Sequence, residues 1–237
     1  IFLRPKIIIC CPTNITGVEK NAIREAAEKI GAKKVYIEEE PKAAALGAGL
    51  EISAPSGSMV VDIGGGTTDI AVLSLGGIVT SASIKIAGNT FDKDITKYIK
   101  DKYKLLIGER TAEEIKIQIG SVFNDTNEKM DVRGRNLVTG LPHTIHVTSS
   151  EIKDALSDSA LSIVRTVKNV LEQTPPELSA DIIEKGIVLT GGGALLNGLD
   201  SLLAKELKVP VRIAENPLSC VAEGTGVLLN NLYLIER

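Results

Sequence analysis

The sequence predicts an α/β protein in which strands run into glycine-rich turns. Apolar, β-branched runs alternate with segments of helical periodicity along most of the chain, as is typical of α/β folds. Glycine triplets at residues 64–66 and 191–193 directly follow two of these apolar runs. With 237 residues, the chain can form one large domain or two smaller ones, with ample core either way.

The composition argues against a nucleic-acid surface and against a metal centre built from cysteine or histidine. The formal net charge is −3, no basic face is concentrated anywhere, and tryptophan is absent. Cys10, Cys11 and Cys220 have no metal-ligand spacing, which favours reduced core thiols. His143 and His146 lie on an expected strand with no third ligand nearby. Because no apolar run has the length of a membrane span and no signal peptide precedes the first strand, we expect a soluble, cytoplasmic protein.

The first part of the chain predicts two strands and two helices. An apolar run at residues 6–11 is typical of a strand covered on both faces, and residues 35–37 predict a second, short strand. A capping box at Thr16 opens a helix that Gly31 ends. Pro41 then opens a helix over residues 42–50, whose many small residues permit close backbone packing. Residues 53–58 have the composition of a linker, so we expect a domain boundary there.

The remainder of the chain predicts further strands and helices. We expect strands at residues 59–63, 69–74, 78–86, 131–138, 143–148, 186–189 and 211–214. We expect helices at residues 91–102, 111–122, 151–173 and 199–207, and a last helix to residue 230 with Asn216 as its cap and Pro217 at its first position.

The stretch from Val60 to Ile70 predicts a hairpin that holds phosphate. Successive glycines let the backbone turn at positive φ and approach a ligand with its amide N–H groups inward. Asp62, at the strand end, can hold a water or a metal-bound water near a phosphate. Dinucleotide and Walker loops run from strand to helix, whereas this chain runs from strand to turn to strand. The alternative is a plain glycine-rich hairpin without a ligand.

The second glycine turn, residues 190–198, follows a strand and enters a helix, where helix-terminal N–H groups can face a ligand. Because both turns follow apolar strands, an α/β sheet can place them over one crevice. Between them, Glu113 and Lys116 have the i, i+3 spacing of one helix face and could contact ribose hydroxyls and a base. The alternative for this pair is a solvated capping turn.

Taken together, residues 62–69, 39–47 and 190–198 resemble motifs of the actin, sugar-kinase and heat-shock-chaperone ATPase superfamily. Within that superfamily, residues 10–16, 108–113, 174–178 and 190–196 resemble the bacterial actin family MreB/Mbl. The resemblance implies an actin-like ATPase fold with ribonuclease H-like subdomains. Its expected division is 1–53 with 221–237 as the remainder of subdomain IA, 54–88 with 153–220 as IIA, and 89–152 as IIB. We expect subdomain IB and the first phosphate motif to be absent, so that the chain is N-terminally incomplete.

The same resemblance implies a site for ATP or ADP and Mg²⁺. The residues that match phosphate contacts are Gly64, Gly65, Gly66 and Thr67. The residues that match ribose and adenine contacts are Glu113, Glu114, Ile115 and Lys116. The adenosine loop matches Gly192, Gly193, Ala194, Leu195 and Leu196. Asp62 matches the carboxylate that orients magnesium-bound water. The catalytic glutamate aligns with Glu39, whose alternative role is complementing a helix dipole.

The implied function is a slow ATPase that polymerises into membrane-associated filaments and organises cell-wall synthesis and rod shape. The expected partners are further copies of the chain, the inner face of the cytoplasmic membrane and cell-wall synthesis and morphogenesis proteins, without nucleic acid. Ile1, Phe2 and Leu3 match an apolar membrane-inserting loop, and the alternative is a frayed apolar terminus. A sugar kinase and a chaperone ATPase are the alternative functions.

Overall fold

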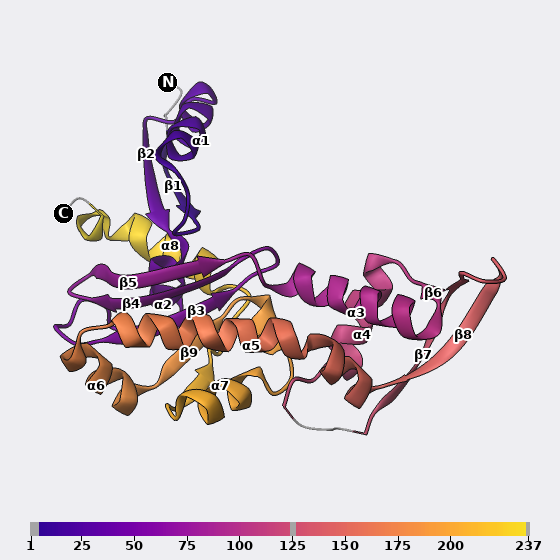
Figure 1. The fold of residues 1–237 in the computed structure, drawn as a ribbon. Coiled ribbons are helices and arrows are strands. Elements are labelled where there is room, and N and C mark those ends of the chain that lie inside the picture. The colour runs from indigo at the N-terminus through magenta and orange to yellow at the C-terminus, as the bar shows by residue number, and fades with distance from the viewer. Residues whose placement is uncertain (1–4, 124–126, 236–237) are drawn as a thin grey trace.

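The computed structural model of the protein describes residues 5–123 and 127–235, and both strands and helices recur along the chain (Figure 1). The α/β class expected from the sequence is confirmed. Ile1, Phe2 and Leu3 lie outside the described residues, so the membrane loop stays a prediction. In the described part of the chain, no helix is both long enough and apolar enough to cross a bilayer.

A five-stranded sheet lies at the centre of the molecule. Its strands, in spatial order, are β10 (Val211–Ile213), β9 (Ile187–Thr190), β3 (Ser58–Ile63), β4 (Thr68–Ser74) and β5 (Gly77–Ile84). β3 runs parallel to β9 and antiparallel to β4. Every residue of β3 and β4 is buried, because helices cover the sheet on both faces.

Alternate residues of β3 and β4 face different helical layers, as the period of two requires. On one face, residues such as Val61 and Ile70 pack into the main core with α5 (Ser149–Gln173), α6 (Pro176–Lys185) and α7 (Leu199–Leu207). On the other face, Val60 and Ala71 pack against α2 (Glu40–Gly47).

The helix α2 also packs tightly against α8 (Cys220–Asn230). A Cβ on Gly47 would lie 1.8 Å from the carbonyl oxygen of Cys220, and one on Gly224 would lie 1.8 Å from that of Ala43. The two backbones therefore touch, which is the close packing expected from the small residues of the first of these helices.

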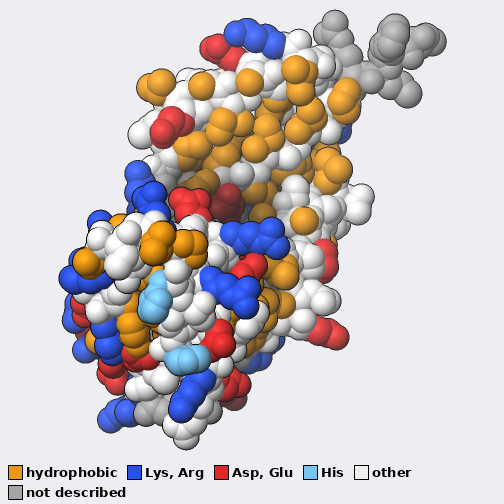
Figure 2. Space-filling view, turned by 90° about the vertical axis from the view of Figure 1, so that its right-hand side faces the viewer, with side chains coloured by type: hydrophobic (Ala, Val, Ile, Leu, Met, Phe, Trp, Pro, Cys, Tyr) orange, Lys and Arg blue, Asp and Glu red, His pale blue; other side chains and the backbone are white. Residues whose placement is uncertain are grey.

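A smaller unit projects from α2 and consists of β1 (Lys6–Cys11), α1 (Gly17–Lys29) and β2 (Lys34–Glu39) (Figure 1). The two strands are parallel, and α1 covers the face that carries Ile7, Ile9 and Ile37. Figure 2 shows hydrophobic side chains gathered over this upper part of the molecule. The chain passes from β2 into α2 without a loop, so the end of this unit is joined directly to a helix of the central layer.

A third unit lies beside the central sheet, on the right in Figure 1. It contains α3 (Gly88–Tyr103), α4 (Glu109–Ile119) and a small antiparallel sheet of β6 (Leu105–Leu106), β7 (Lys129–Asn136) and β8 (Pro142–Thr148). Two 3₁₀ turns, η1 (Gly192–Leu195) and η2 (Leu232–Leu234), complete the described elements.

Several details of the sequence prediction are wrong; α3, for example, begins at Gly88 rather than at residue 91. No helix is expected from the sequence at Pro176–Lys185, where the structure has α6. The helix α4 begins at Glu109, two residues before the expected capping box. The helix α8 begins at Cys220 with Ser219 as its cap, because the backbone around Pro217 forms a turn whose carbonyl accepts a 2.8 Å hydrogen bond from Gly191 N.

Candidate functional site

The two glycine-rich turns lie side by side at one end of the central sheet. β3 and β9 are parallel neighbours with Asp62 opposite Thr190, so both chains leave the sheet at the same edge. A cavity of about 600 Å³ opens there and is lined by Gly64 and Gly65 of the first turn and by Gly192 and Gly193 of the second. The structure thus brings together two turns more than 120 residues apart, as the sequence predicted.

The hairpin turn after β3 rests on the start of α3. Gly64 N donates to Thr67 O at 2.9 Å, Gly88 N to Gly64 O at 3.1 Å, and Asn89 N to Gly65 O at 2.8 Å. None of the three glycines has a positive φ, so the expected left-handed turn is wrong. Gly66 is exposed, and Thr67 lines a separate cavity with Pro12 and Lys85, so these two do not line the cavity between the turns.

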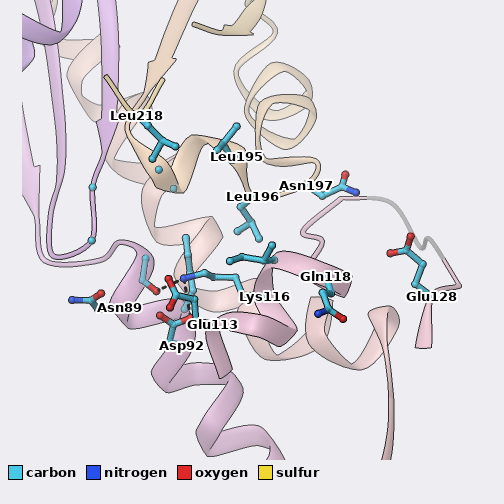
Figure 3. Close-up of a pocket in the computed structure, with 18 residues that line it drawn as sticks. Asn89, Asp92, Glu113, Lys116, Gln118, Glu128, Leu195, Leu196, Asn197 and Leu218 are labelled. Atoms are coloured by element: carbon cyan, nitrogen blue, oxygen red, sulfur yellow. Dashed lines mark hydrogen bonds and ion pairs between the residues drawn. The ribbon is translucent and has the colours of Figure 1, made fainter. Parts of the chain in front are cut away.

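The second turn is tightly packed beneath the cavity. Gly191 has φ +80°, and η1 follows it before the chain enters α7. Leu195 and Leu196 line the cavity together with Gly192 and Gly193, and Leu218 faces it from the next turn (Figure 3). Ala194 is fully buried under the turn and does not line the cavity.

One face of α4 closes the cavity from the side. Glu113 and Lys116 both line it, as their i, i+3 spacing predicted (Figure 3). The Lys116 ammonium lies 2.8 Å from an Asp92 carboxylate oxygen and donates to Gly88 O at 3.3 Å, so it is held across the start of α3.

The other two α4 residues of the predicted site do not reach this cavity. Ile115 is buried in the main core, and Glu114 pairs with the exposed Arg110 at 3.1 Å. Residues between the positions of an i, i+3 pair turn away from the face that the pair shares. Of the four consecutive residues 113–116, helical periodicity therefore places only the first and the last at the cavity.

Two buried carboxylates lie at the base of the hairpin. Asp62 on β3 is directly opposite Asp69 on β4, so both side chains point to the same face of the sheet. They are 6% and 1% exposed, respectively. Asp62 accepts a 2.7 Å hydrogen bond from the Thr190 hydroxyl, but burial still raises its pKa, and the nearby Asp69 adds to that increase.

A third carboxylate, Glu40, comes to this pair from the first residue of α2. Burial raises the pKa of Glu40 to about 7, with further contributions from Asp69 and then Asp62. Of its neighbours on β2, Glu38 pairs with Lys42 at 3.1 Å, and Glu39 is the N-cap of α2 without a side-chain cap bond. The glutamate that interacts with the hairpin carboxylates is therefore Glu40, one residue beyond the Glu39 chosen from sequence.

Several residues of this arrangement were missed in the sequence. Asp69, Thr13, Asn89 and Thr190 all contact the hairpin or its carboxylates. Asp69 carried a signal, since a carboxylate within an otherwise apolar strand needs a reason to be buried. Thr13 carried none, because its contact joins positions 56 residues apart.

The fold and this site define the class: an α/β protein of actin-like fold with paired glycine turns over one cavity. The family description "MreB/Mbl protein" matches residues 1–237. The chain belongs to the MreB/Mbl family.

Curated relatives of the family align along nearly all of the chain. The cell shape-determining protein Mbl of Bacillus subtilis is 65% identical over 238 positions, which cover 100% of this chain and 72% of the relative. The cell shape-determining protein MreB of Escherichia coli is 52% identical over 231 positions, which cover 96% of this chain and 67% of the relative.

Solved structures agree with the fold. MreB5 of Spiroplasma citri bound to ADP is 44% identical, with a TM-score of 0.93 over 96% of this chain and 69% of that one. The structure of the same protein bound to AMPPNP has a TM-score of 0.92 and covers 95% of this chain and 68% of that one. The MamK double helical filament, at 21% identity and a TM-score of 0.78 over 96% and 69%, supports the fold alone.

Proposed function

We propose that this protein binds ATP and hydrolyses it slowly, and that the nucleotide controls assembly into filaments. The observation that carries the proposal is the single cavity between the two glycine turns, with three carboxylates gathered at the base of the hairpin. The MreB5 structures with ADP and with AMPPNP, at 44% identity, support a nucleotide as its occupant.

In this proposal the phosphates lie against the hairpin and the nucleoside lies between α4 and η1. Gly64 and Gly65 offer bare backbone at the cavity wall, which lets a phosphate approach closely. Lys116 and Glu113 would contact the ribose and base, and Leu195 and Leu196 would pack against them. Gly66 and Thr67 would contact the terminal phosphate from the exposed side of the turn.

The carboxylates fit a hydrated divalent cation rather than a directly held one. One oxygen of Asp69 is buried without a hydrogen-bond partner in the described chain, and Asp62 lies opposite it. Among the residues that the structure describes, no three acidic, histidine or cysteine side chains converge closely enough to hold a metal. We infer that Asp62 would contact Mg²⁺ through water, as carboxylates commonly do for this ion. Bound Mg²⁺ would neutralise charge on the phosphates.

We propose Glu40 as the residue that orients the attacking water and accepts its proton. Its pKa of about 7 suits a general base at neutral pH. Glu39 stays a candidate from sequence, and replacing each separately decides between them. Loss of phosphate release in Glu40→Gln, with Glu39→Gln unchanged, is the expected result.

For the cellular role, we propose filaments that associate with the inner face of the membrane and organise cell-wall synthesis and rod shape. The support is the identity of 65% and 52% to relatives named cell shape-determining proteins. In this proposal Ile1, Phe2 and Leu3 would contact the bilayer. We also propose that the chain has the subdomain division expected from its sequence. Flotation with liposomes tests the membrane contact, because Phe2→Ser should reduce it.

Sedimentation of the intact protein with ATP tests filament formation. We expect pelleting that depends on nucleotide. A protein that stays monomeric with ATP and lipid, but phosphorylates a sugar, would contradict the filament proposal and support the sugar-kinase alternative.

A further inference from the structure

Asp69 is buried where a charge is costly. It is 1% exposed on β4 and lies directly opposite Asp62, and like charges opposite one another destabilise a sheet. One of its oxygens, Oδ2, has no hydrogen-bond partner within the described chain. Its neighbours on the same face of β4, Ala71 and Leu73, are apolar.

The other oxygen of Asp69 holds a loop of the small unit. Oδ1 accepts a 3.1 Å hydrogen bond from Thr13 N and a 3.2 Å hydrogen bond from the Thr13 hydroxyl. Thr13 follows β1, so these bonds connect the β1–β2 unit to the strand that leaves the glycine hairpin. Pro12 and Asn14 of the same loop line a cavity together with Thr67, so the loop lies beside the glycine turn.

We propose that Asp69 is a positioning residue that fixes Glu40 relative to the glycine hairpin by holding Thr13. The inference rests on the nucleotide hydrolysis proposed above. It adds Asp69 to the residues involved, and the contacts through which Asp69 affects Glu40. Cys11, two residues before Thr13, pairs in register with Glu39, the residue before Glu40. A shift of the Thr13 loop therefore reaches Glu40 through one pair of parallel strands.

A second contact of β1 provides a matched control. The Cys10 thiol and the Thr225 hydroxyl lie 3.1 Å apart, and this contact ties the same strand to α8 rather than to the hairpin. Removing either threonine hydroxyl costs the small unit one hydrogen bond. Of the two hydroxyls, that of Thr13 donates to Asp69, beside the Thr13 backbone N–H, whereas that of Thr225 contacts Cys10.

The test compares Thr13→Val, Thr13→Ser and Thr225→Val in the intact protein. We expect Thr13→Val to lower kcat for ATP hydrolysis by about tenfold or more with KM changed less than about twofold, since small misplacement of a reacting group costs rate. Thr13→Ser should restore kcat, and Thr225→Val should leave it unchanged. Asp69→Ala should lower kcat at least as far, and the milder Thr13→Val keeps the test decisive if Asp69→Ala fails to fold.

Hydrogen–deuterium exchange without nucleotide separates this proposal from the proposed function. Faster exchange at residues 13–16, 39 and 40 in Thr13→Val, but not in Thr225→Val, is expected even if the wild-type protein hydrolyses no ATP. Absence of hydrolysis in the wild type would overturn the proposed function. Unchanged exchange at these residues, or a kcat equal to wild type in Thr13→Val, would overturn the positioning role.

Discussion

The two glycine-rich turns look alike in sequence but use their glycines differently. At the second turn, Gly191 has φ +80°, and a Cβ on it would lie 2.3 Å from Ile63 O. A Cβ on Gly193 would lie 2.3 Å from Ile63 Cγ2. At the hairpin, by contrast, the nearest atom to a Cβ on Gly65 is Asn89 Oδ1 at 3.4 Å, and a Cβ on Gly66 would meet nothing within 4 Å.

The second turn therefore needs glycine in order to fold, whereas the hairpin does not. A glycine that packing and backbone angles do not require still costs conformational entropy on folding, and it stabilises nothing in the structure. Its use is then the close approach of something outside the chain. This difference makes the hairpin the better candidate for direct contact with a ligand, although both turns border the same cavity.

The largest effect on stability is expected at the second turn. Gly191→Ala should lower the free energy of unfolding by about 3 kcal/mol or more, because a positive φ and a backbone clash coincide there. Urea unfolding followed by circular dichroism measures this loss. A variant as stable as the wild type would contradict the claim that the second turn needs glycine in order to fold.

On the hairpin side, the largest effect is expected on hydrolysis rather than on stability. Glu40→Gln should slow phosphate release by about 100-fold, the usual contribution of a general base. Glu39→Gln, one residue away, is the matched control and should stay within about twofold of the wild type. Equal rates in the two variants would contradict the role given to Glu40.

The same variant is expected to change how stability depends on pH. The Glu40 pKa is raised from 4.5 to about 7 in the folded protein, so the folded state holds this proton more tightly than the unfolded state. The resulting stability is present below pH 4.5 and is lost as pH rises through about 7. The midpoint temperature of thermal unfolding, measured between pH 5 and 8, should depend less on pH in Glu40→Gln than in the wild type. An unchanged slope would argue against a proton on Glu40.

A smaller effect is expected on the side wall of the cavity. Lys116→Met keeps the aliphatic stem but removes the ammonium that contacts Asp92 and Gly88 O. We expect the dissociation constant for ADP to rise by about fivefold to tenfold, which corresponds to about 1 to 1.4 kcal/mol. Isothermal titration calorimetry measures it, and an unchanged constant would place the nucleoside elsewhere.

The smallest effect is expected two residues earlier on the same helix. Glu114→Ala breaks only an exposed i, i+4 ion pair with Arg110, and such pairs contribute about 0.5 kcal/mol or less. Neither thermal stability nor ADP affinity should change measurably. A clear loss of ADP affinity would restore Glu114 to the site that the sequence motif assigned to it.

How far the sequence could predict this molecule depended on the range of each interaction. Local patterns were enough for β1, for α7 and for the hairpin strands, since period and turn residues lie within a few positions of one another. Choosing Glu40 over Glu39 required knowing which side chain at the end of β2 faces Asp62 and Asp69, and three consecutive glutamates carry no such information. The contact between Thr13 and Asp69 was equally invisible, because it depends on how two units pack.

The most direct test is ADP binding by Gly65→Ala, measured beside its unfolding. Gly65 lines the cavity, its φ is not positive, and a Cβ there would make only an ordinary contact with Asn89. We expect the dissociation constant to rise by at least about tenfold, while the free energy of unfolding stays within about 0.5 kcal/mol of the wild type or increases slightly. A wild-type dissociation constant, or a loss of stability comparable to that of Gly191→Ala, would contradict the assignment of the hairpin to a ligand.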